Sequence, residues 1–419
     1  MKTNYLIPLM LLGFAPPAYA ANPEDVQQLL ETKQCPQCDL REANLEGADL
    51  QGANLRGANL EEANLKEANL QGANLTEANL ENAIFNELER GAIRSQVKPL
   101  ETAVNYLIPS DDIVTNLDNA NLRGANLRFA QLPKVSLRNA DLHNVDLYGA
   151  NLSYANLAQA DLTESYLVLV NLNYANLSNA NLQSVDLSGS SLVQAVLVNV
   201  ALDFSILDGT TLNYANLSRA SLIDANFAGA NLINTKLQNV IAERAGFYTA
   251  NLSGANLSGA MLKNVGFNKA NLSNANLSDT DLTNSKFGIA NLTNADLTGA
   301  QLRFAYLESA TLTNSILDGT DLYRANLRST AMQNSSLIGA SLVEANFINA
   351  QLNNANLAYS NLTDSDFRAS NLDSADLTYT NLSNVNWDNA FLRNVDVANA
   401  DMSQTTFKGA RGVLPTFPN

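Results

Sequence analysis

The sequence is poor in the side chains that carry most enzyme chemistry. Its 419 residues include one histidine (His143), one tryptophan (Trp387) and two cysteines. Such a set leaves little material for a metal centre or an activated nucleophile. Basic residues are also scarce, with 25 Lys and Arg against 41 Asp and Glu and a net charge of −16. Nucleic-acid binding needs a basic face, so we expect no nucleic-acid partner. Because His and Cys are so few, we also expect no cofactor, no metal and no catalytic residue.

Long apolar runs are absent beyond the N-terminus, so no transmembrane helix is expected in the body of the chain. Residues 1–20 combine Lys2, an apolar run over 6–14 and the triplet Ala18-Tyr19-Ala20. This order is typical of a secretory signal peptide cleaved after Ala20. A retained apolar segment is the alternative. We expect a product without a membrane span, exported to a periplasm or thylakoid lumen or secreted.

What the sequence has in abundance is a repeat of five residues. Leu occupies every fifth position from Leu40 to Leu80, and Phe85 takes the next. A second block, out of phase with the first, runs at the same period from Leu117 to Phe407, and only Ala242 interrupts its large apolar residues. The residue two positions before each of these centres is small, mostly Ala.

A period of five fits neither a helix nor a long strand. The small residue and the centre are two apart, however, so both point to one side of a short extended segment. The other residues, rich in Asn, Asp, Ser and Gly, suit a corner. The chain is therefore predicted to coil with its Leu and Ala side chains inside.

The aromatic centres of the second block indicate how many sides each coil has. Their positions all differ by multiples of 20: Phe227, Phe247, Phe267, Phe287, Phe347, Phe367, Trp387 and Phe407. Four sides of five residues would stack all eight rings in one interior column. The 10 centres of the first block and 59 of the second then make about 17 coils, a rod roughly 80 Å long.

These residues resemble the pentapeptide repeat family, whose signature is Ala-(Asn/Asp)-Leu-x-x, over about 38–410. The resemblance implies an all-β fold, a right-handed quadrilateral β-helix. Some acidic members protect DNA gyrase by imitating duplex DNA. A C-P-x-C start, as in Cys35-Pro36-Gln37-Cys38, resembles that of exported members from photosynthetic bacteria.

We divide the chain into a signal peptide (1–20), a cap helix with the CPQC segment (21–38), a short repeat block (39–85), an insertion (86–116), the main solenoid (117–410) and a tail (411–419). The cap helix is predicted over 22–33, with Asn22 as N-cap and Val26, Leu29 and Leu30 as its apolar side. It should lie across the open end of the first coil. The insertion is either functional or a tolerated loop.

Cys35 falls on a centre position and Cys38 on a small inward position of the same register. A disulfide, two buried thiols or a redox pair are all compatible with C-x-x-C spacing. His143 follows a centre and is expected on the surface.

One outward face of the main solenoid carries apolar residues. Tyr154, Tyr174 and Tyr214 share a column, and Val193 and Ile233 share the adjacent one. Tyrosine with aliphatic neighbours suits a protein-protein contact; scattered surface aromatics are the alternative. We expect a non-catalytic extracytoplasmic interaction scaffold whose partner protein and oligomeric state the sequence leaves open. An acidic DNA mimic is the alternative function.

Overall fold

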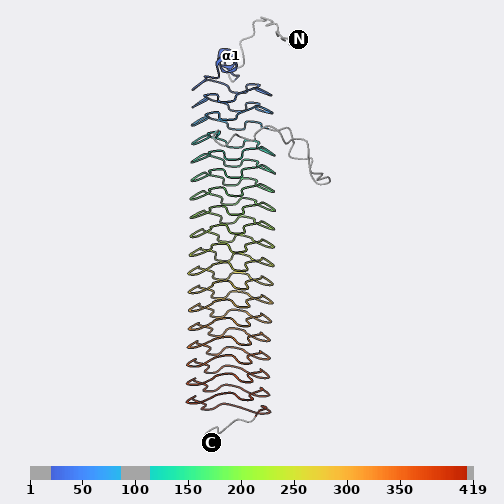
Figure 1. The fold of residues 1–419 in the computed structure, drawn as a ribbon, viewed down its shortest axis with the longest axis vertical. Helices are drawn as coiled ribbons and strands as arrows, with labels where there is room; N and C mark the ends of the chain where they lie inside the picture. The colour runs from blue at the N-terminus through green and yellow to red at the C-terminus, as the bar shows by residue number, and fades with distance from the viewer. Residues whose placement is uncertain (1–19, 86–113, 413–419) are drawn as a thin grey trace, which may run out of the picture.

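The protein is a straight rod of stacked coils, shown in Figure 1 with its N-terminal end at the top. The computed structural model describes residues 20–85 and 114–412. Backbone pairing in these ranges consists of isolated parallel bridges, and no longer strand forms there. In the main solenoid each bridge joins a residue to the one 20 positions later, as Asn151 joins Asn171. One coil therefore has four sides of five residues, which is the predicted β-helical architecture.

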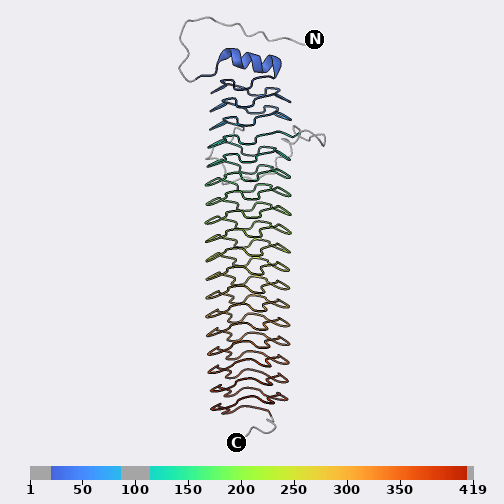
Figure 2. The same ribbon diagram turned by 90° about the vertical axis from the view of Figure 1, so that its left-hand side faces the viewer.

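The helix α1 (Pro23–Thr32) covers the N-terminal end of the rod, and Figure 2 shows it lying across the first coils. Asn22 caps it, because its side chain accepts a hydrogen bond from the Glu24 backbone N–H at 3.1 Å. Leu29 is fully buried against the core. The prediction for Leu30 was wrong: this residue is 51% exposed, since the helix turns its Leu29 side toward the coil.

Every backbone N–H of a typical repeat has a partner, as residues 151–155 illustrate. Asn151 and Leu152 donate to carbonyls of the neighbouring coils, and Ala155 closes the turn by donating to Leu152 O at 3.0 Å. The Tyr154 N–H reaches Asn173 O at 2.8 Å. The remaining N–H, on Ser153, donates to the Asn151 side chain at 3.1 Å. Asn or Asp precedes the centre so often because its side chain satisfies this last donor.

The second corner residue of each repeat has a left-handed backbone, with φ of 60° at Tyr154 and 65° at Gly149. A turn of this kind requires positive φ at that position, which Gly and Asn adopt most readily. This explains the frequent Gly and Asn of the corners. At Tyr154 the backbone hydrogen bond to Asn173 holds the residue in the same left-handed conformation.

The core is the predicted set of inward columns, with the centre and small residues almost fully buried along most of the rod. The aromatic column is present, and its rings stack one coil apart. Phe247 lies 4.8 Å from Phe227 and 5.1 Å from Phe267, measured between ring centroids. Trp387 stacks on Phe367 at 4.7 Å. Stacked rings thus pack coil against coil along one side of the interior.

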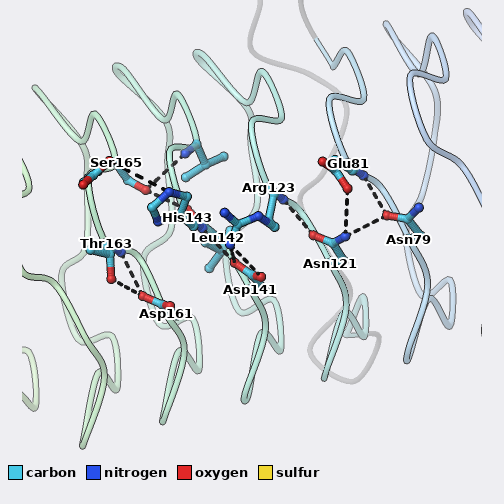
Figure 3. A network of polar contacts seen from close by, with 12 residues as sticks. Asn79, Glu81, Asn121, Arg123, Asp141, Leu142, His143, Asp161, Thr163 and Ser165 are labelled. Carbon is cyan, nitrogen blue, oxygen red and sulfur yellow. Dashed lines mark hydrogen bonds and ion pairs between the residues drawn. The ribbon is translucent and has the colours of Figure 1, made fainter.

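The two repeat blocks form one rod. Asn121 donates to the Asn79 side chain at 2.9 Å across the junction, and Figure 3 shows this bond within a row of polar contacts. Residues 86–113 of the predicted insertion lie outside the described residues. Asn116 already pairs with Asn74 and Ser136, so the second block begins one residue before the predicted start. At the other end Arg411 still pairs with Phe391, inside the predicted tail.

Candidate protein-interaction surface

The three predicted tyrosines lie on one corner of the rod and point outward. Tyr154, Tyr174 and Tyr214 are 56%, 44% and 55% exposed. The rings of Tyr154 and Tyr174 are parallel and 4.7 Å apart. Gln194 occupies the coil between Tyr174 and Tyr214, so the column of rings is interrupted there.

Val193 and Ile233 lie beside the tyrosines. The Tyr174 N–H donates to Val193 O at 2.9 Å, and the Tyr214 N–H donates to Ile233 O at 3.0 Å. Both aliphatic side chains are half-buried. Together these five residues form a surface that we call the tyrosine stripe. Backbone hydrogen bonds fix the position of each member on its coil, so the stripe presents aromatic, aliphatic and hydroxyl groups at regular intervals.

The sequence reasoning missed a buried ion pair on another corner. Arg128 and Asp146 are joined at 2.9 Å, and their side chains are only 7% and 9% exposed. The guanidinium lies over the Tyr148 ring, 4.4 Å from its centroid. The sequence feature that could have indicated this pair is a spacing of 18 residues. This spacing places a corner arginine next to a carboxylate on the following coil. The same spacing joins Arg303 to Asp321.

Exposed arginines lower the pKa of carboxyl groups that lie 20 residues away, on the neighbouring coil. The Arg244 guanidinium donates two hydrogen bonds to Asp224, at 2.8 and 2.6 Å, and lowers the pKa of that carboxyl. In the same way Arg324 lowers the pKa of Glu344. These pairs lie outside the tyrosine stripe.

Cys35 and Cys38 are joined by a disulfide with their Cα atoms 5.3 Å apart, and both are buried in the first coil. His143 is partly exposed, and its Nε2 lies 3.9 Å from Glu164. Among residues 20–85 and 114–412, no three His, Cys, Asp or Glu side chains gather closely enough to hold a metal ion. No helix within these ranges is long and apolar enough to cross a membrane.

Family models match most of the chain. Pentapeptide repeats match in eight copies, over residues 38–76, 58–88, 115–153, 146–189, 175–213, 207–239, 250–288 and 290–328. A pentapeptide repeat region matches residues 340–411. The chain belongs to the pentapeptide repeat family. No curated protein matches it.

Several solved structures of this family are similar to the chain. HetL, a protein involved in heterocyst differentiation regulation from the cyanobacterium Nostoc sp. strain PCC 7120, is 28% identical, with 66% of this chain and 89% of HetL covered and a TM-score of 0.19. QnrB1, a plasmid-mediated fluoroquinolone resistance protein, is 18% identical, with 44% and 86% covered and a TM-score of 0.29. A pentapeptide repeat protein of the Arabidopsis thaliana thylakoid lumen is 25% identical, with 25% and 68% covered and a TM-score of 0.19.

Proposed function

We propose that this pentapeptide repeat protein is a non-catalytic scaffold that binds another protein outside the cytoplasm. Members of the family are generally non-catalytic structural proteins. The observation that carries the proposal is the tyrosine stripe, where large aromatic side chains stand half-exposed on a rigid corner. Tyrosine is enriched at protein interfaces because its ring is apolar and its hydroxyl can form hydrogen bonds.

The stacking of Tyr154 on Tyr174 supports this role. A side chain that is already held in place loses little conformational freedom when a partner covers it. Val193 and Ile233 add apolar surface beside the rings. A partner with an apolar centre and a few hydrogen-bonding groups would match this composition.

Export is part of the proposal. The order of Lys2, an apolar run and Ala18-Tyr19-Ala20 supports a signal peptide, although these residues lie outside the described ranges except Ala20. A disulfide between Cys35 and Cys38 is compatible with an oxidising compartment. Intact-mass measurement of the protein recovered from the exported fraction should give a chain beginning at Ala21. A chain that keeps Met1 would reject export by this route.

The stripe is tested by comparing two double variants as bait in pull-downs from the exported fraction. Tyr174→Ser with Tyr214→Ser removes two rings of the stripe. Tyr359→Ser with Tyr379→Ser removes a stacked exposed pair on a different corner and serves as the control. A partner that is captured by the wild type and the control, and lost with the stripe variant, supports the proposal. A partner bound equally by all three would move the site elsewhere, and residues 86–116 become the next region to test.

The DNA-mimic alternative fits the charge distribution less well. Duplex DNA carries one negative charge per roughly 1.7 Å of its axis. On this rod a net charge of −16 is spread over a length of roughly 80 Å, or about one charge per 5 Å. The charge density of the rod is therefore far below that of the duplex.

A further inference from the structure

One side of the rod carries no charge over eleven consecutive coils. It comprises the outward positions 151, 153 and 154 and their equivalents every 20 residues as far as 351, 353 and 354. All 23 charged residues between Asn151 and Asn354 lie on the other sides. We call this surface the neutral ribbon. Its first half contains the tyrosine stripe, and its second half consists mainly of Asn, Ser, Thr and Gln.

The second half of the ribbon is held in place by a ladder of amides. Asn294, Asn314, Asn334 and Asn354 each donate a side-chain hydrogen bond to the asparagine one coil earlier, at 3.1 to 3.2 Å. Because these side chains are already ordered, covering them costs little conformational entropy. Each amide still has a second N–H that the ladder does not use. The ribbon is therefore a rigid, uncharged surface that offers hydrogen-bonding groups at regular intervals.

We propose that the neutral ribbon is the contact surface between two copies of this chain packed side by side. This rests on the proposed role of the tyrosine stripe in protein binding and names a partner for it. A chain with a net charge of −16 repels its own copies. The neutral ribbon is the side along which two rods approach with the least repulsion. Depletion of charge and enrichment of aromatics are also the composition of a protein-interface core.

The size of the ribbon fits a small, reversible dimer interface. Two of the five residues of a side form the corner turn, so a side is about three extended residues or about 10 Å wide, and eleven coils span about 50 Å, which gives roughly 500 Å² per copy. The pair would bury about 1,000 Å² in total, which is at the lower end of specific interfaces. The rod is straight in both views, so two ribbons can stay in contact along their length.

The symmetry of such a pair follows from the two halves of the ribbon. In an antiparallel pair the two-fold axis passes near Asn251 and Gly254, the middle of the ribbon. Tyr154 of one copy then lies opposite Asn354 of the other. The tyrosine half of each rod meets the amide half of its partner, where hydroxyl and amide groups can exchange hydrogen bonds.

The chain contains a matched pair of positions for the test. Residues 251–255 and 256–260 both read Asn-Leu-Ser-Gly-Ala and lie on adjacent sides of one coil. In both, the Ser N–H donates to the Asn side chain, at 3.2 Å for Ser253 and 3.0 Å for Ser258. Ser253→Glu places charge at the centre of the ribbon, and Ser258→Glu places the same charge outside it.

The experiment is sedimentation velocity, at several concentrations, of the protein purified from the exported fraction. We expect the wild type and Ser258→Glu to dimerise, and Ser253→Glu to weaken the dimer at least tenfold. Salt should strengthen the dimer, because it screens repulsion between the charged sides. A monomeric wild type would overturn the proposal, and so would a dimer that Ser253→Glu leaves unchanged. A monomer that binds an immobilised neutral polysaccharide through the ribbon would also overturn it. A monomeric rod that still captures another protein through Tyr174 and Tyr214 would leave the scaffold function standing.

Discussion

Phe85 and Leu127 lie in the same inward column on consecutive coils. The Phe85 N–H donates to Asn126 O at 3.0 Å. Elsewhere in the rod, the N–H of a centre residue donates to the carbonyl oxygen of the residue 19 positions later. The offset across the junction is 42 residues, as for Asn79 and Asn121, instead of 20. Phe85 therefore joins the column of Phe227 and Phe247. The two blocks, which are out of phase in the sequence, keep one register in space.

The first prediction tests this register. Replacing residues 86–113 with the six residues Glu-Gly-Ala-Asn-Leu-Gln restores an offset of 20 and places one ordinary repeat after Phe85. We expect the shortened chain to fold with a melting temperature no lower than that of the full chain, because the two blocks then follow each other with the same offset as the rest of the rod. Circular dichroism and thermal melting provide the measurement. A control linker of seven residues should lower the melting temperature, because it shifts the register by one residue. Equal stability of the two shortened chains would contradict the assignment.

The second prediction concerns the aromatic column. Phe267 is fully buried and stacks on Phe247 and Phe287, each at 5.1 Å. Phe267→Ala should lower the free energy of unfolding by about 3–5 kcal/mol. Distant coils should keep their structure, because each coil contacts only its neighbours. Gln301→Ala, at an exposed outward position, is the control. Denaturant titration of both variants gives the comparison, and similar losses would mean that the ring does not support the core as described.

Much of the fold was predictable because a period of five separates inward from outward positions. The aromatic spacing of 20 added the number of sides. The ion pair of Arg128 with Asp146 was not predictable in the same way, since an offset of 18 has meaning only once a coil of 20 is known. Leu30 was misplaced because the rotation of α1 depends on how it lies on the first coil. The three tyrosines of the stripe are exposed in one column, whereas the binding role of the stripe and the right-handed sense of the coil stay predictions.

The third prediction concerns Asn314, a corner asparagine that forms side-chain hydrogen bonds and also adopts a left-handed backbone conformation. Asn314 donates to the Asn294 side chain and accepts from Asn334, and its φ is 59°. Asn314→Ala removes both bonds and leaves a residue with a Cβ in a left-handed conformation. We expect a loss of about 1–3 kcal/mol in the free energy of unfolding.

Asn314→Gly also removes the bonds but adopts positive φ without strain, so its loss should be about 1 kcal/mol smaller. Urea titrations at one fixed protein concentration measure both variants. If the glycine variant were the less stable of the two, backbone conformation would not explain the preference for asparagine at this corner.

The fourth prediction concerns Cys35 and Cys38. Thiol labelling of the unfolded protein should modify neither cysteine without reductant and both after reduction. Reduction should cost at most about 2 kcal/mol, because the loop closed by a separation of three residues is short. The change should be confined to α1 and the first coil. Hydrogen exchange of the reduced protein checks this, and increased exchange in the main solenoid would contradict it.

The last prediction uses the exposed pair of Asp224 and Arg244. The guanidinium holds the pKa of the Asp224 carboxyl below its ordinary value of 3.8. A carboxyl whose pKa is lower in the folded state stabilises the fold above the unfolded pKa, and this stabilisation is lost as the pH falls through the folded pKa. Arg244→Gln should therefore lower the melting temperature slightly near neutral pH. The difference from the wild type should shrink below about pH 4 and close as Asp224 becomes protonated.

Arg219→Gln is the matched control, because Arg219 is an exposed corner arginine and no ion pair to it is found within the described ranges. Its melting temperature should follow that of the wild type at every pH. Thermal melts of the three proteins between about pH 7 and about pH 2 make the comparison. If the Arg244→Gln difference stayed constant over this range, the arginine would act by packing its aliphatic portion on the rod. The charge of Asp224 would then contribute nothing to the stability of these coils.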